Sequence, residues 1–116
     1  METDNNKSNL EGIDVQNIEN DKIKRVLELC TREELESLRI YTGSNTPDPF
    51  GFEERYGVIE GKLDNLDIQV IVFDTYIHGT ENLINTRYVF KANGEVVFGS
   101  DAEKAFNILV KYAKKI

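Results

Sequence analysis

His78 is the first candidate for acid–base chemistry, because it is the single histidine of the 116 residues. Imidazole is the side chain that most readily exchanges a proton near neutral pH. Asp74 and His78 lie four residues apart in a strand-like segment, so they share a face but stand about 13 Å apart. Only Glu81, across the loop that follows, remains as a partner with which His78 could act in general acid–base catalysis.

Metal and redox chemistry find little support in the sequence. Cys30 is the single cysteine, which excludes a disulfide framework. A zinc site needs three or four protein ligands, and Cys30 with His78 supplies two. We therefore expect neither a metal nor a cofactor.

Catalytic motifs are also missing from the sequence. It contains no G-x-S-x-G, no H-E-x-x-H and no glycine-rich phosphate-binding loop. His78 is then expected to be a strand-end or loop residue, and the protein is expected not to be an enzyme. A small enzyme or small-ligand domain with a pocket near His78 and Glu81 is the alternative.

The segment between residues 46 and 56 carries the strongest binding signal. Its two prolines exclude a helix and a central strand. An aromatic anchor with a charged rim is typical of protein-binding surfaces. Alternatively, the phenylalanines fold back and plug the open end of the core. The candidate partner-binding residues are Asp48, Phe50, Phe52, Glu53, Glu54 and Tyr56.

The elements that must position these residues follow from polar clusters and apolar periodicity. Residues 1–17 read as a disordered acidic tail, and residues 18–116 read as a single domain. Strands are predicted at residues 56–63, 68–77, 85–91 and 95–98, and helices at residues 21–30, 31–40 and 101–115.

Local end signals support the predicted helices and one hairpin. Asn20 has the position of a helix cap. Capping-box spacing places Thr31 three residues before Glu34, and Ser100 has the same relation to Glu103. Asn-Gly at residues 93–94 is the strongest short-range hairpin signal.

The predicted connections are too short for parallel crossovers, so the strands should form a four-stranded antiparallel meander. The C-terminal helix should pack on this meander together with one or two N-terminal helices. The expected fold class is therefore an α+β two-layer sandwich.

Both faces of the longest predicted strand are apolar between Val70 and Phe73. The C-terminal helix can cover one face of the sheet. The other face requires the N-terminal helices, a second copy of the chain in a homodimer, or another protein.

The formal net charge of −7 bears on the choice of partner. Phosphate backbones repel an acidic chain, so direct binding of nucleic acid is not expected. The segment Gly99–Ala113 and its preceding strands resemble a double-stranded RNA-binding domain. However, the basic run of that family is replaced here by Asp101, Glu103 and Lys104, which argues against RNA binding.

These observations favour a small, acidic, non-enzymatic module that binds another protein with a basic surface. Its size and charge are those of inhibitors of basic nucleic-acid-handling proteins, as in phage counter-defence or toxin immunity. A homo-oligomeric structural or regulatory subunit is a further alternative. No signal-peptide pattern and no membrane-length apolar run occur, so a cytoplasmic protein with no membrane contact is expected.

Overall fold

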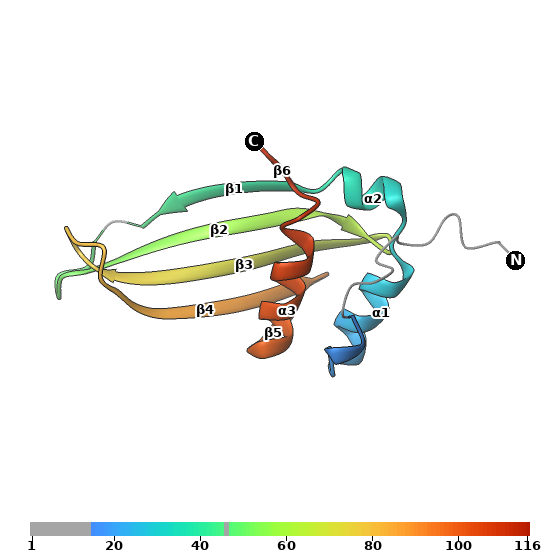
Figure 1. The fold of residues 1–116 in the computed structure, drawn as a ribbon, viewed down its shortest axis with the longest axis horizontal. Helices are drawn as coiled ribbons and strands as arrows, with labels where there is room; N and C mark the ends of the chain where they lie inside the picture. The colour runs from blue at the N-terminus through green and yellow to red at the C-terminus, as the bar shows by residue number, and fades with distance from the viewer. Residues whose placement is uncertain (1–14, 46) are drawn as a thin grey trace, which may run out of the picture.

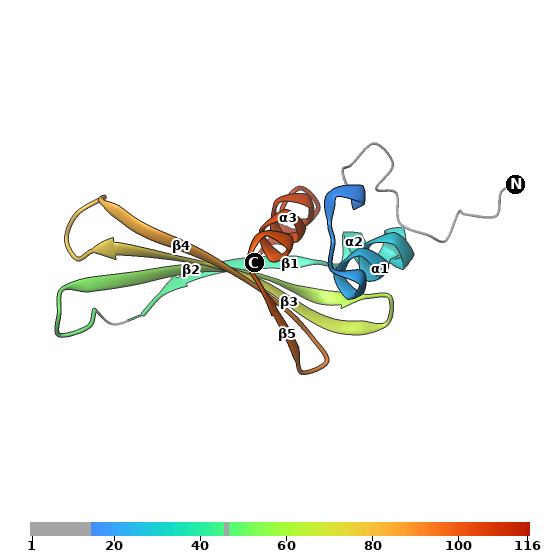
Figure 2. The same ribbon diagram turned by 90° about the horizontal axis from the view of Figure 1, so that it is seen from below.

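A single layer of helices covers one face of a twisted sheet (Figures 1 and 2). The computed structural model describes residues 15–45 and 47–116. Within them the fold is α+β, and the sheet has six strands in the order β5-β4-β3-β2-β1-β6. All neighbouring strands are antiparallel except β1 and β6. The elements are η2 (Val15–Asn17), α1 (Asp21–Leu29), α2 (Arg32–Glu36), β1 (Arg39–Ser44), β2 (Phe52–Leu63), β3 (Leu66–Ile77), β4 (Leu83–Ala92), β5 (Glu95–Phe98), α3 (Ser100–Leu109) and β6 (Lys114–Lys115).

The predicted tail overlaps the first described element. Residues 1–14 lie outside the described residues. Val15 opens the 3-10 turn η2, and its side chain is buried in the core. The described core therefore begins before residue 18, where the domain was predicted to start.

The two N-terminal helices begin at the predicted caps. The Asn20 side chain accepts a hydrogen bond from Ile23 N at 3.0 Å. Thr31 and Glu34 form the reciprocal capping box, with bonds of 2.9 and 3.1 Å. These local signals satisfy backbone donors that would otherwise lack partners at a helix start.

The prediction that the second helix continues to Ile40 is wrong. Helix α2 ends at Glu36, and Arg39–Ser44 form strand β1 beside β2. Lys114 N donates to Leu38 O at 3.0 Å, so β6 pairs along the outer edge of β1. Tertiary pairing thus overrides a weak helical pattern, and it also accounts for the two strands beyond the predicted four.

The predicted start of the first strand at Tyr56 is also too late. Strand β2 begins at Phe52, which lies opposite Ile77 of β3. The β2–β3 turn uses positive backbone φ at Asp64 and Asn65, and the predicted Asn93–Gly94 hairpin joins β4 to β5. These tight turns fix the strand register and confirm the central antiparallel meander.

The C-terminal helix is shorter than predicted and begins differently. Gly99, with φ of 96°, occupies the N-cap position without a side-chain cap, so Ser100 is not the cap. Helix α3 ends at Leu109 rather than near Lys115, because the chain turns there to form β6. Its inward side is buried as expected, at Ala102, Ala105, Phe106, Ile108 and Leu109.

All the described helices contribute to one core on one face of the sheet. Buried residues of α1, α2 and α3 pack with inward residues of β2, β3 and β4 in a single cluster. A second, smaller cluster on the opposite face contains Val58, Ile71 and Val89, with aromatic side chains around them. No described helix contributes to that second cluster. We call the side that carries it the open face.

The sheet extends beyond the helices at one end (Figures 1 and 2). There the ends of β2, β3 and β4 and their connecting loops project as a ribbon. We call residues 47–56 and 74–87 the distal arm. Helix α3 lies at the base of this arm, where Phe106 lines a hollow together with Tyr56 and Asp74, and no described helix covers the outer part.

Glu34 connects the helical layer to the β2–β3 turn, at the end of the sheet opposite the distal arm. Its carboxylate accepts hydrogen bonds from Thr31 N, Asp64 N and Asn65 N at 2.9 to 3.0 Å. Burial would raise the pKa of Glu34, but these backbone bonds together lower it below its ordinary value of 4.5. The β2–β3 turn, where two residues have positive φ, is thereby held against α2.

We expect Glu34→Gln to reduce the free energy of unfolding by about 1–2 kcal/mol at pH 7, because one amide oxygen replaces two anionic acceptors. Because the pKa of Glu34 is lower in the folded than in the unfolded state, its carboxylate stabilises the fold at pH values above the unfolded-state pKa. This contribution disappears as the pH falls through the folded-state pKa. Urea unfolding at pH 7 and pH 3 should therefore show a wild-type advantage that shrinks in acid. Glu33→Gln, in the same first turn, is the control. Equal effects of both substitutions would contradict this role.

Candidate functional site

The far end of the distal arm is formed by two loops that touch each other. His78 N donates to Gly51 O at 2.8 Å, which joins the β3–β4 loop to the loop before β2. Within the β3–β4 loop, Ile77 N donates to Asn82 O at 3.1 Å. The two loops therefore present one surface (Figure 1).

Asp48 organises the loop before β2. Its Oδ1 accepts hydrogen bonds from Phe50 N and Phe52 N, both at 2.9 Å. Asp48 N donates to Phe52 O at 2.9 Å, and Gly51 provides the positive φ of 92° that closes the turn. The Asp48 side chain thus preorganises the backbone that carries the two phenylalanines.

Phe50 points into solvent at the end of the arm. It is 83% exposed, and Phe52 beside it is 41% exposed. The interpretation that both phenylalanines plug the core is therefore wrong. Other exposed apolar residues come from the ends of β3 and β4. We call the whole set the tip patch: Phe50, Phe52, Ile77, Leu83 and Ile84.

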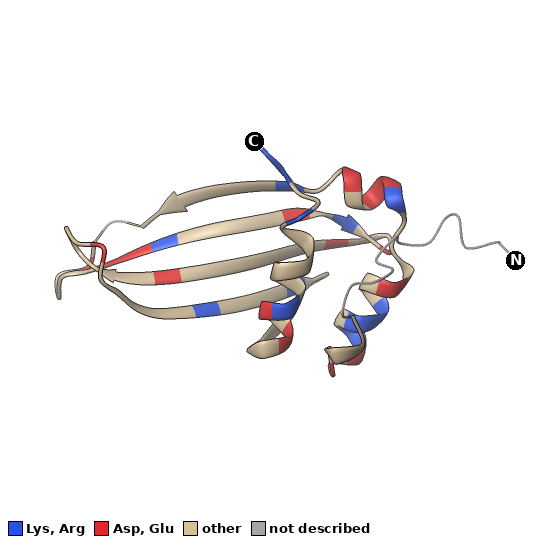
Figure 3. Cartoon of the chain, viewed as in Figure 1, with Lys and Arg blue, Asp and Glu red and all other residues tan. Residues whose placement is uncertain are grey.

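Two acidic residues of the predicted rim lie behind the tip patch and are paired with arginines. Neighbouring residues of a strand face opposite sides, so Glu53 and Glu54 project to different faces. Glu54 pairs with Arg87 and accepts a bond from Asn45 Nδ2 at 2.7 Å. Glu53 lies 3.1 Å from Arg55, and Arg55 and then His78 lower the pKa of Glu53. Figure 3 shows these alternating charges along the arm.

The proposed pair of His78 and Glu81 is not brought together. His78 Nδ1 lies 3.3 Å from Glu53 Oε1, whereas Glu81 binds Arg55 at 3.2 Å. Their side chains are 57% and 84% exposed. Arg55 also lies 4.0 Å from the ring centroid of Tyr76, and Glu81 followed by Glu53 raises its pKa. Arg55 is therefore the centre of the ionic network, and it connects the two loops.

Tyr56, the last predicted site residue, belongs to another surface. It packs with Phe73 on the open face, with 6.5 Å between ring centroids. Of the six predicted residues, Phe50 and Phe52 thus belong to the tip patch and Tyr56 to the open face. Glu53 and Glu54 pair with arginines, and Asp48 braces the loop. Sequence reasoning missed Leu83 and Ile84, which reach the tip through the β3–β4 register shift after Thr75.

Two hollows in the structure can be compared with the pocket expected near His78. One, of about 540 Å³, lies between the sheet and α3, where Arg55 and Asp74 approach Phe106. Neither His78 nor Glu81 lines it, and Asp74 accepts a bond from Thr86 at 2.8 Å. The hollow is thus lined by Glu53 and Arg55, the ionic partners of His78 and Glu81, and not by those two residues themselves.

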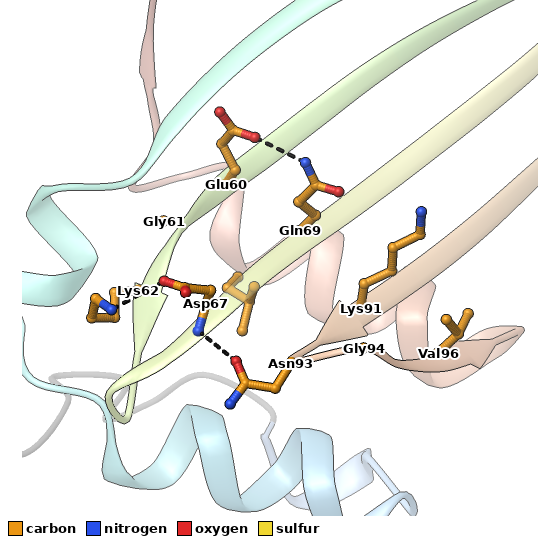
Figure 4. Close-up of a pocket in the computed structure, with 10 residues that line it drawn as sticks. Glu60, Gly61, Lys62, Asp67, Gln69, Lys91, Asn93, Gly94 and Val96 are labelled. Atoms are coloured by element: carbon orange, nitrogen blue, oxygen red, sulfur yellow. Dashed lines mark hydrogen bonds and ion pairs between the residues drawn. The ribbon is translucent and has the colours of Figure 1, made fainter.

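The second hollow, of about 800 Å³, is a shallow depression on the sheet next to the β2–β3 turn (Figure 4). Its two carboxylates have partners: Glu60 accepts a bond from Gln69, and Asp67 pairs with Lys62, both at 3.0 Å. Asp67 N also donates to Asn93 at 3.2 Å. These contacts connect neighbouring strands and give no nucleophile–base pair.

Within residues 15–45 and 47–116, no group of three or more His, Cys, Asp or Glu side chains is placed to hold a metal ion. In the same part of the chain, no helix is long and apolar enough to cross a membrane. The chain matches no protein-family model, no curated protein and no solved structure.

We expect Asp48→Ala to loosen the loop that presents Phe50, because two backbone donors lose their acceptor. Amide hydrogen exchange at Phe50 and Phe52 should accelerate about tenfold, the equivalent of one charge-assisted hydrogen bond. Asp48→Asn keeps the accepting oxygen and should exchange at nearly the wild-type rate. Unchanged exchange in Asp48→Ala would contradict the bracing role.

Proposed function

We propose that this protein is a non-catalytic module that binds another protein through its tip patch. The observation that carries the proposal is the 83% exposure of Phe50 on a loop braced by Asp48. Phenylalanine in water loses the free energy of burial, so this position is unfavourable for the isolated chain. A partner pocket that buries the ring would recover about 1.5–3 kcal/mol.

The rigidity of the tip favours binding. Loops that become ordered only on association lose conformational entropy at that moment. Here the Asp48 bonds and the bond from His78 N to Gly51 O hold the backbone before any partner arrives. The ionic network around Arg55 fixes the second loop in the same way.

The negative charge of the distal arm favours a partner whose pocket for Phe50 is surrounded by basic residues. The distal arm carries five carboxylates and two arginines. Glu53, Glu54 and Glu81 are already paired, so their contribution is a general negative potential that speeds encounter. Asp48 adds a further negative charge at the tip itself. Binding should consequently weaken as salt concentration rises.

More specifically, we propose that the module inhibits a basic protein that handles nucleic acid. This proposal is supported by the small size of the chain, its net charge of −7 and the protruding apolar tip. Such a module would act by occupying the basic surface of its partner. Chemical conversion of a substrate is not required.

We expect the double substitution Phe50→Ala and Phe52→Ala to abolish partner capture and leave the protein folded. An exposed ring contributes little to the stability of the isolated chain, so the melting temperature should change by only a few degrees. The measurement is affinity capture with mass spectrometry, followed by titration of the captured protein. Phe98→Ala, an exposed phenylalanine at the end of β5, is the matched control. Undiminished capture by the double variant would refute the tip as the binding site.

A further inference from the structure

The open face of the sheet is arranged in rows that run across the strands. Side chains of residues directly opposite each other in a sheet share a face. The strand register therefore places five residues side by side in one apolar row. This apolar band consists of Tyr41, Val58, Ile71, Val89 and Phe98.

A largely polar row borders the band on one side, and an aromatic row with one arginine borders it on the other. The row nearer the β2–β3 turn contains Arg39, Glu60, Gln69, Lys91 and Val96. The row on the side of the distal arm contains Tyr56, Phe73 and Arg87, and Arg87 lies 4.9 Å from the Phe73 ring centroid. An apolar centre with charged borders is the composition of a protein interface.

The open face has a different charge from the rest of the chain. Five basic residues share this side with three acidic ones: Arg39, Lys62, Arg87, Lys91 and Lys114, with Glu54, Glu60 and Asp67. The whole chain carries −7. A basic partner would be attracted to the acidic arm, whereas this mixed face, with a small excess of basic residues, suits a surface with the same pattern.

The pattern is complementary to itself about one axis. A two-fold axis parallel to β3 and between two copies places β2 over β4 and β1 over β5 of the other copy. Val58 then faces Val89, Tyr41 faces Phe98, and Ile71 faces its own equivalent.

The same two-fold axis also pairs the residues that border the apolar band. Glu60 faces Lys91 of the second copy, and Tyr56 faces Arg87 of the second copy. These contacts are an ion pair and a cation–π pair, respectively. The other in-plane axis, across the strands, would place Lys91 over Arg87, which is repulsive.

From this we infer that the protein forms a homodimer in which the two open faces pack against each other about an axis parallel to β3. Aligned sheets pack about 10 Å apart, which is within reach of paired Glu and Lys side chains. The dimer covers the ring of Phe98, which is 71% exposed in the single chain. The axis keeps both distal arms at the same end of the dimer. The inference rests on the open face alone, so it does not depend on the proposed function.

A charge-swap experiment tests the axis directly. Lys91→Glu places two acidic residues together at both symmetric contacts, and Glu60→Lys places two basic residues together. We expect each variant to dimerise at least about tenfold more weakly than the wild type in sedimentation velocity across micromolar to sub-millimolar concentrations. Mixing the two variants in equal amounts should restore a dimer, because both contacts again pair opposite charges.

Lys111→Glu makes the same charge change at an exposed residue just after α3 and should dimerise like the wild type. If Glu60→Lys does not fold, Phe98→Ala supplies the second variant, because its exposed ring would face Tyr41 of the other copy. Phe50→Ala alone, in the loop before β2 and outside the facing strands, should retain the dimer. A wild-type monomer at every concentration, a dimer indifferent to Lys91→Glu, or charge variants that fail to associate when mixed would each overturn the inference.

Discussion

The described helices cover the sheet on one face only, and this one-sided coverage determines which surfaces of the protein remain open. Helices α1, α2 and α3 all pack against the same side, and Glu34 fastens their layer to the β2–β3 turn. This arrangement concentrates the core at one end of the sheet. The open face and the distal arm are consequently the two surfaces that the described helices do not cover, and both proposed interactions use them.

The outer part of the distal arm has to remain ordered without a helix on either side. Cross-strand pairing from Phe52↔Ile77 inward supplies the backbone bonds. Arg55 over Tyr76 and Arg87 over Phe73 cover the ring surfaces that a helix would otherwise bury, and acidic partners orient both arginines. The charges that sequence reasoning assigned to a partner thus contribute first to the stability of the arm.

Local signals in the sequence predicted local structure well. The Asn20 cap, the Thr31–Glu34 box and the Asn93–Gly94 turn each depend on residues a few positions apart, and the structure confirms them. Strands β1 and β6 arise from pairing between distant segments, which periodicity does not reveal. Among the candidate site residues, the sequence identified Phe50 but could not decide its exposure, because a phenylalanine is more often buried. Leu83 and Ile84 were missed because a bulge positions them.

Hydroxyl-radical footprinting of Phe50 and Phe98 tests the one-sided arrangement most directly, because both rings are expected to be reactive only if no described element covers them. In dilute protein we expect strong modification of both rings. At concentrations where the protein dimerises, Phe98 should become protected and Phe50 should remain reactive. Protection of Phe50 in the dilute, isolated chain would contradict the exposed tip, and equal reactivity of Phe98 in monomer and dimer would contradict packing of the open faces.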